Sequence, residues 1–198
     1  MPTKNFYNLD IDKQKRILES AKKEFSENFY EDASINKIIK NINMPRGSFY
    51  LYFENKEDLY LYILELYLKE FKNTLLDLLK QNNYDIFESF IKLYDYILNV
   101  NKVEKNLVDK IFINMNSKRF EYAIPKILKK EADGSIINLI KINNDYIDEE
   151  NIGIIMSILM PILFINVSTV LSEPNNKEII KEFYIKQINI IKKGLERK

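Results

Sequence analysis

The sequence predicts an all-α protein of about nine helices, in which an N-terminal three-helix unit with a helix-turn-helix precedes a C-terminal helical domain. Its 198 residues include only 4 Gly and 5 Pro, so few positions break helices. Apolar residues recur at spacings of three and four along most of the chain, which is the period of an amphipathic helix. With 46% hydrophobic and 30% charged residues, the chain can bury a core.

The first two helices are indicated by caps and apolar stripes. The first runs from about Asp10 or Asp12, either of which can cap it, to Asn28. Its apolar stripe consists of Ile17, Leu18, Ala21 and Phe25. Ser34 is a suitable N-cap for a second, short helix, whose apolar face consists of Ile35, Ile38, Ile39 and Ile42.

A tight turn and a third short helix follow. Asn43 tolerates the left-handed backbone conformation that such a turn needs. Pro45 suits the first turn of a helix that we expect to end near Leu51. Gly47 and Ser48 are small enough to let another surface approach closely, either DNA or the second helix. Two short helices joined in this way indicate a helix-turn-helix.

The remaining helices are expected at about residues 56–81 after an Asn55 cap, then at 84–100, 103–114, 125–141, 148–171 and 174–195. Pro125 starts or kinks the fourth of these helices, and Gly134 weakens it. Residues 152–171 carry no charge and approach the length of a membrane span. Their polar residues, Pro161 and their acidic N-terminal flank favour a helix buried on nearly all sides, at a centre or a dimer interface.

The composition excludes several classes of chemistry. Cys and His are both absent, which removes thiolate nucleophiles, disulfides and the commonest general base and metal ligand. No phosphate-binding loop, dinucleotide fingerprint or nucleophile elbow is present. We therefore expect no enzyme, no metal and no cofactor. The polar residues 1–12 lack the apolar region of a signal peptide, so we expect a cytoplasmic protein with no membrane partner.

Charge is concentrated around the helix-turn-helix. The whole chain carries a net charge of only +1, but residues 34–56 contain four basic residues against one acidic residue. Such a local excess suits contact with phosphates, although a solvated charged face would look the same.

Residues 16–59 resemble the TetR/AcrR family of bacterial transcriptional repressors. The most specific match is the run Gly-Ser-Phe-Tyr-x-Tyr-Phe-x-x-Lys-x-x-Leu from Gly47 to Leu59. The resemblance implies a DNA-binding domain at residues 1–59 and an effector-binding and dimerisation domain at 60–198. It further implies a homodimer whose two heads read a palindromic double-stranded DNA operator, with half-sites ~34–36 Å apart, and which a small molecule releases. The uncharged helix and the last helix would form a four-helix bundle across the two-fold axis.

The same resemblance implies roles for single residues. The DNA-binding positions would be Ser34, Lys37, Arg46, Gly47, Ser48, Tyr50, Tyr52 and Lys56. Ser34 would cap its helix and meet a phosphate, Arg46 would reach a guanine edge or a phosphate, and Lys56 would clamp a phosphate. Tyr50 and Tyr52 would place their hydroxyls on phosphates. Packing in the core is the alternative for both tyrosines, and free solvation is the alternative for Lys37.

Four positions depart from the family pattern. Phe29 stands where Gly is usual, so we expect Asn28 to adopt the left-handed conformation one residue earlier. Asn43 replaces the usual turn Gly, which is a mild change. Ile39 and Ile42 replace small Ala residues and can change the angle between the two helices.

An effector pocket would lie in the C-terminal domain, and because it would contain no His or Cys it should suit a small apolar or aromatic effector. Candidate lining residues are Tyr67, Phe71, Phe87, Phe90, Tyr94, Phe112, Met115, Met156, Met160 and Phe164. Aromatic and Met residues at helical spacing also fit a plain core. The alternative to a DNA-binding repressor is a helical protein-interaction module of the same fold without specific DNA binding.

Overall fold

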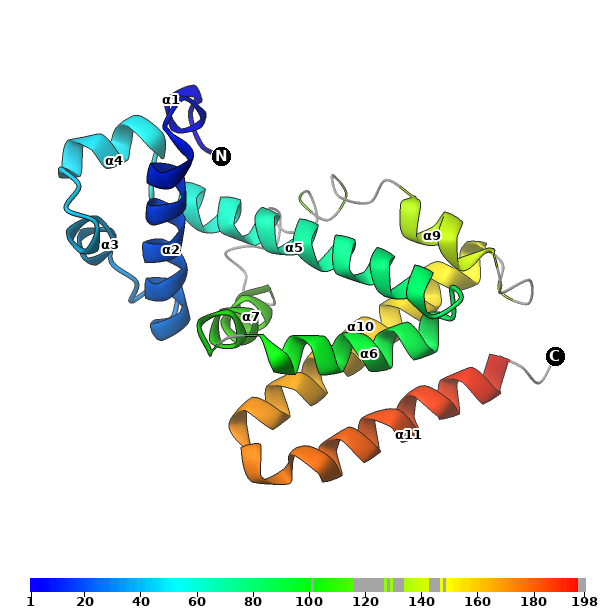
Figure 1. The fold of residues 1–198 in the computed structure, drawn as a ribbon. Helices are drawn as coiled ribbons and strands as arrows, with labels where there is room; N and C mark the ends of the chain where they lie inside the picture. The colour runs from blue at the N-terminus through cyan, green and yellow to red at the C-terminus, as the bar shows by residue number, and fades with distance from the viewer. Residues whose placement is uncertain are drawn as a thin grey trace. The chain divides into compact units, whose positions relative to one another are not determined.

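The computed structural model describes residues 1–100, 102–115, 127, 129, 134–142, 147 and 149–195 (Figure 1). Every regular element in these ranges is a helix, so the predicted all-α class is confirmed. The chain forms two compact units. Unit 1 contains Met1–Leu68 and Asn101–Ile127, and unit 2 contains Lys69–Val100 and Leu128–Lys198.

Unit 1 contains the predicted helix-turn-helix. Its helices are α1 (Lys4–Tyr7), α2 (Ile11–Glu27), α3 (Ile35–Asn41), α4 (Arg46–Tyr52), the first part of α5 (Lys56–Gln81) and α7 (Lys102–Met115). α2 packs against α3 and α7, and α4 packs against α1 and α3. The short helix α1 was not predicted, because four residues are too few to show a helical period.

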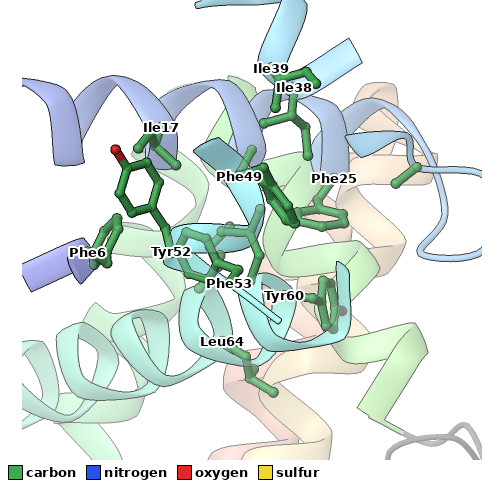
Figure 2. Packing of buried hydrophobic residues seen from close by; sticks show 14 of the residues in the cluster. Phe6, Ile17, Phe25, Ile38, Ile39, Phe49, Tyr52, Phe53, Tyr60 and Leu64 are labelled. Carbon is green, nitrogen blue, oxygen red and sulfur yellow. The ribbon is translucent and has the colours of Figure 1, made fainter. Parts of the chain in front are cut away.

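An aromatic and aliphatic cluster holds unit 1 together. Figure 2 shows Ile17 and Phe25 from α2, Ile38 from α3 and Phe49 from α4 gathered in one group, and all four are fully buried. The rings of Phe25 and Tyr60 meet edge to face, with centroids 5.0 Å apart. Helices as short as α3 and α4 are unstable alone, so this packing sets their geometry.

Side chains define the ends of the helices in unit 1. The Asp10 carboxylate accepts a hydrogen bond from the Lys13 N–H over 2.7 Å, which confirms one of the two predicted caps of α2. Asn55 accepts one from the Asp58 N–H over 2.9 Å at the start of α5, also as predicted. The expectation for Asn28 was wrong. Its backbone is extended (φ −124°), and its amide donates to the Glu24 carbonyl, so no left-handed residue is needed there.

Unit 2 contains the second part of α5, α6 (Ile86–Asn99), α9 (Ser135–Ile140), α10 (Glu149–Ser172), a short 3-10 helix η2 (Pro174–Asn176) and α11 (Lys177–Leu195). α6 packs against both α10 and α11. The stacked rings of Tyr94 and Tyr184, 4.7 Å apart, join α6 to α11. The Tyr184 hydroxyl also donates to the Phe90 carbonyl over 2.9 Å. Burial raises the pKa of Tyr184 above its ordinary value.

Two predicted boundaries in unit 2 shift. α6 begins at Ile86 because the Asp85 carboxylate accepts the N–H groups of Phe87 and Glu88. We predicted one helix over residues 125–141, weakened at Gly134. Instead, Gly134 adopts a left-handed conformation (φ +76°) and is the N-cap at which α9 begins. Most residues of that predicted helix before Gly134 lie outside the described ranges.

α10 is the uncharged helix. Glu150–Ser172 is long and apolar enough to cross a membrane by length and mean hydropathy, but only 33% of its most apolar window is buried within the described chain. The expectation of burial on nearly all sides is therefore wrong for a single chain, since Ile154, Ile158 and Ile165 are exposed. On the buried side, Asn166 donates to Gln187 of α11 over 2.9 Å.

Candidate nucleic-acid interface

The turn between α3 and α4 has the predicted left-handed residue. Asn43 has a φ of +52°, and the Met44 N–H donates to the Ile39 carbonyl over 2.9 Å. Pro45 is the N-cap of α4, one residue outside the position that we expected. Ile39 and Ile42 pack against the core of unit 1, so the larger side chains at these positions are accommodated by burial.

Two polar side chains of α2 donate hydrogen bonds to backbone carbonyls of the helix-turn-helix. Arg16 donates to the Ile42 carbonyl over 3.2 Å, and the Ser20 hydroxyl donates to the Ile38 carbonyl over 2.9 Å. Neither residue was predicted to have a functional role. Their spacing of four on α2 places them on one face, which is the sequence signal that points to a shared partner.

α4 presents a small polar surface to solvent. Arg46, Gly47 and Tyr50 are exposed, and Ser48 is half-buried. A Cβ atom added to Gly47 would meet nothing within 4 Å, so packing within the chain does not require a glycine there. The second helix is therefore not the surface that approaches Gly47. Beside the turn lies an open groove of about 300 Å³, lined by Asp10, Asp12, Lys13, Arg16, Ile42, Asn43, Met44, Pro45 and Ser48.

The two tyrosines of α4 have different environments. Tyr50 is 45% exposed, and its side chain is available to a partner. Tyr52 is only 7% exposed and belongs to the core, with the Lys13 ammonium 5.9 Å from the centre of its ring. Figure 2 shows the Tyr52 hydroxyl directed away from Phe53. A DNA contact by Tyr52 stays a prediction, and burial limits it to the tip of the side chain.

At the N-terminus of α3, a carboxylate that we did not predict accepts a backbone N–H. Ser34 occupies the N-cap position, but its hydroxyl makes no capping hydrogen bond, contrary to our expectation. Its N–H donates instead to the Glu24 carboxylate over 2.9 Å. Glu24 is only 4% exposed, and the exposed Lys37 ammonium lies 3.8 Å from the same carboxylate oxygen. A buried negative charge therefore lies at the end of α3 where a phosphate was expected.

Lys56 makes extensive contacts within the chain. Its ammonium group donates to the carbonyl oxygens of Tyr30, Glu31 and Ala33 over 2.6, 3.0 and 2.9 Å. The ammonium also lies 4.6 Å from the centre of the Tyr30 ring. An ammonium has three N–H donors, so these three carbonyls satisfy all of them. Lys56 thus fastens the α2–α3 connection to the start of α5.

Arg46 is oriented by a neighbour across the turn. Its guanidinium donates to the side-chain oxygen of Asn36 on α3 over 3.1 Å, and both residues are exposed. Among the described residues this bond uses one of its five N–H donors, which leaves four for other partners.

Residues 17–63 match the model for bacterial regulatory proteins of the tetR family, and residues 85–195 match the model for the tetracyclin repressor-like C-terminal domain. The chain belongs to the TetR family. Like its relatives, this TetR-family chain is a helix-turn-helix transcriptional regulator. Its helix-turn-helix lies within the N-terminal match.

Individual relatives agree with this assignment. The chain is 30% identical over 133 residues to the uncharacterized HTH-type transcriptional regulator YhgD of Bacillus subtilis, covering 67% of this chain and 68% of that protein. It is 24% identical over 127 residues to the uncharacterized HTH-type transcriptional regulator YdgC of Bacillus subtilis, covering 62% of this chain and 65% of that protein. A crystal structure of a TetR family transcriptional regulator from Chloroflexus aurantiacus has the same fold, with a TM-score of 0.55, 20% identity and 98% coverage of both chains.

The predicted pocket residues divide between the two units. Tyr67 lies in unit 1, where the Lys22 ammonium is 4.8 Å from its ring. In unit 2, Phe87, Phe90 and Tyr94 are fully buried, whereas the others are half-buried, namely Phe71, Met156, Met160 and Phe164. The rings of Phe71 and Phe164 stack with centroids 6.0 Å apart. The side chains of Phe112 and Met115 lie outside the described part of the structure.

Proposed function

We propose that this TetR-family regulator is a cytoplasmic homodimeric repressor that binds a palindromic operator through α4 and leaves it when a small apolar or aromatic molecule binds. The observation that carries the proposal is the surface of α4. Arg46, Gly47 and Tyr50 face solvent there, while Phe49 is fully buried and fixes the helix. A short, rigidly held helix with polar residues on its free face suits the DNA major groove.

We propose contacts at five exposed or half-buried residues, and a sixth at the tip of the buried Tyr52 side chain. Arg46 reaches a guanine edge or a phosphate, because a guanidinium binds either in a bidentate manner. Gly47 admits the DNA backbone, and Ser48 touches base or phosphate. Tyr50 and Lys37 contact phosphates, since both are exposed.

Ser34 and Lys56 act differently in this proposal. The Ser34 N–H is bonded to Glu24, and the Lys56 donors are bonded to three carbonyls. Both residues therefore position α3 against the rest of unit 1. We retain residues 1–59 as the DNA-binding domain and 60–198 as the effector-binding and dimerisation domain.

The proposed dimer interface is the apolar face of α10 and α11. Ile154, Ile158 and Ile165 are exposed on α10 at spacings of four and seven. Ile179, Phe183 and Ile190 repeat the same spacings on α11 and are also exposed. The two helices pack together in unit 2, and α10 leaves most of its apolar window uncovered. A second copy of the chain would cover both stripes, in a bundle of four helices.

The proposed effector region lies in unit 2. Half-buried Phe71 and Phe164 stack there, and they offer an apolar surface. The Tyr94 hydroxyl is buried and has no hydrogen-bond partner among the described residues. Burial, with Asp95 and Glu178 nearby, raises the pKa of Tyr94 to about 12, so the hydroxyl is a neutral donor. The apolar surface of Phe71 and Phe164 supports an apolar or aromatic ligand.

Selection of bound sequences from random duplex DNA tests the DNA contacts. The wild-type protein should enrich a palindrome, and Arg46→Ala and Tyr50→Phe should each weaken binding to it, with about 1–3 kcal/mol lost for a base contact. Glu54→Ala, an exposed residue outside α4, is the control. If no palindrome is enriched, or if Arg46→Ala binds normally, the protein is instead an interaction module.

Light scattering coupled to gel filtration tests the dimer. Ile158→Glu or Phe183→Glu should convert a dimer to a monomer, because either places a charge in the apolar face. Glu182→Lys, an exposed charge change on α11, should leave the dimer intact. A monomeric wild-type protein, or a Phe183→Glu dimer, would contradict the interface.

Thermal shift with an aromatic compound library tests the effector site. A hit should raise the melting temperature and release the enriched duplex, and Phe164→Ala should abolish both effects without weakening DNA binding. Tyr96→Ala, an exposed aromatic residue of α6, is the control. A compound that acts equally on Phe164→Ala would place the site elsewhere.

A further inference from the structure

The C-terminal end of α4 is held by residues from the N-terminal segment, far from it in sequence. The last carbonyl groups of a helix have no partners within that helix. At the end of α4, the Thr3 N–H donates to the Tyr52 carbonyl over 2.9 Å. The Thr3 hydroxyl donates to the Leu51 carbonyl over 2.6 Å, and the Asn5 amide approaches the same oxygen at 3.4 Å.

The Thr3 hydroxyl is used for this contact rather than for its own helix. Thr3 is the N-cap of α1, a position where a threonine side chain normally accepts a backbone N–H. Here it makes no such bond. Its hydroxyl donates instead to Leu51, a residue 48 positions away.

α1 is itself anchored, so it can act as a fixed support. Phe6 is fully buried, with its ring centroid 5.0 Å from that of Phe53 and 5.6 Å from that of Tyr62. Phe53 directly follows α4, and Tyr62 lies on α5. Figure 2 shows Phe6 beside Tyr52 within the core. The segment therefore contacts α4 through hydrogen bonds and through the core at once.

The opposite end of α4 is restrained independently. Arg16 of α2 donates to the Ile42 carbonyl in the turn that precedes α4. A seven-residue helix has fewer than two full turns, so its own hydrogen bonds fix its axis poorly. Restraints at both ends determine how α4 is directed.

We propose that Thr3 is a positioning residue for DNA reading, which fixes the axis of α4 by bonding its two terminal carbonyls. Residues 1–9 precede the part of the chain that matches the N-terminal family model, which begins at residue 17. The inference rests on the proposed role of α4 in binding DNA. Thr3 itself touches no base in this proposal.

The test compares Thr3→Val, which removes the hydroxyl but keeps the shape and the N–H, with Thr3→Ser, which keeps the hydroxyl. The DNA is the duplex that the wild-type protein selects from random sequence, with a scrambled duplex beside it. Thr3→Val should bind the selected duplex about three- to tenfold more weakly, as expected for one lost hydrogen bond. Binding to the scrambled duplex should not change, and the melting temperature should fall by only a few degrees, as expected for one exposed hydrogen bond.

Hydrogen exchange gives a readout that needs no DNA. The amide of Phe53, which donates to the Phe49 carbonyl at the end of α4, should exchange faster in Thr3→Val. Thr3→Ser should keep the wild-type affinity and the wild-type exchange rate. Thr74→Val, which removes a hydroxyl from α5 in unit 2, should behave as wild type in both assays.

Two results would overturn the inference. Unchanged exchange and affinity in Thr3→Val would show that the hydrogen bond between the Thr3 hydroxyl and the Leu51 carbonyl does not position α4. An equal loss on both duplexes would make Thr3 a phosphate contact. Arg46→Ala, measured in parallel, separates the two proposals: if it abolishes selective binding while Thr3→Val is silent, only the positioning role fails.

Discussion

The ammonium group of Lys56 lies 2.6 Å from the carbonyl oxygen of Tyr30, across 26 residues of chain. Together with the carbonyls of Glu31 and Ala33, this contact fastens the connection that leads into α3. The resemblance to the family implies a phosphate clamp at this lysine. The geometry supports a different role, in which the Lys56 ammonium binds carbonyl oxygens within the protein.

Salt dependence distinguishes the two roles of Lys56. Each phosphate contact contributes about 0.9 to the slope of log affinity against log salt concentration. We expect Lys56→Met to keep the wild-type slope and to lose about 1–3 kcal/mol of unfolding free energy, because hydrogen bonds to a charged group are lost. Denaturant unfolding and binding titrations at several salt concentrations measure both quantities.

Lys40→Met provides the control for Lys56, since Lys40 is exposed on α3. Its stability should stay at the wild-type value. A slope reduced by about one in Lys56→Met, with unchanged stability, would restore the phosphate clamp.

Glu24 should contribute to stability through its bond to the Ser34 N–H. Glu24→Ala leaves that N–H without its partner in a partly buried site and should cost about 1–3 kcal/mol. Glu24→Gln keeps an acceptor and should cost less. Urea unfolding gives the values, with Glu19→Ala as control because Glu19 is exposed in a surface pair with Lys15. Equal stability of Glu24→Ala and Glu19→Ala would refute the capping role.

The left-handed conformation of Asn43 predicts which residues can replace it. Asn43→Gly should retain wild-type stability to within about 0.5 kcal/mol, because glycine adopts a φ of +52° without strain. Asn43→Val should cost about 1–2 kcal/mol, the steric cost of this conformation for a residue with a branched Cβ. Thermal unfolding measures both changes. A Val variant as stable as the Gly variant would mean that the turn adopts another backbone conformation.

Asp85 should make unfolding depend on pH in the acid range. Partial burial raises its pKa, but hydrogen bonds from Lys192 and from the N–H groups of Glu88 and Phe87 outweigh burial, and the net pKa lies below its ordinary value of 3.8. Because the pKa of Asp85 is lower in the folded state than in the unfolded state, its ionisation stabilises the fold at any pH above the unfolded-state pKa. That stabilisation is lost as the pH falls through the lower, folded pKa.

The difference in unfolding free energy between wild type and Asp85→Asn isolates this contribution. It should be constant above about pH 5 and should shrink below about pH 4. Asp77→Asn, at an exposed pair with Lys80, should show little such dependence. A difference that does not change down to pH 2.5 would contradict the assignment to Asp85.

Much of unit 1 could be predicted from local signals. Caps at Asp10 and Asn55 and the turn residue Asn43 act within four residues of their own positions, so the sequence displays them directly. Apolar residues at spacings of three and four likewise place α2 and α5 close to their predicted bounds, and an acidic first turn followed by an uncharged run does so for α10. Asp85 was missed as a cap because we began this helix at Tyr84, whose left-handed φ of +64° no propensity indicates.

Other features depend on contacts between residues that are distant in the sequence. Glu24 reaches Ser34 across 10 residues, and Thr3 reaches Leu51 across 48. Such bonds join side chains to backbone groups, which carry no residue type that a pattern could reveal. For the same reason, Tyr50 and Tyr52 are equivalent in the sequence, and only packing makes one exposed and the other buried.

The sequence by itself determined the helical class, the helix-turn-helix and the family, because caps, helical periodicity and a local motif are encoded in neighbouring residues. The tertiary structure decided which charged and polar side chains of unit 1 are exposed and which are bonded to the backbone. It left Arg46 and Tyr50 on the surface and engaged Glu24, Lys56 and Thr3 with backbone groups. The physical reason is that backbone donors and acceptors at helix ends need partners, and only the folded chain brings those partners to them.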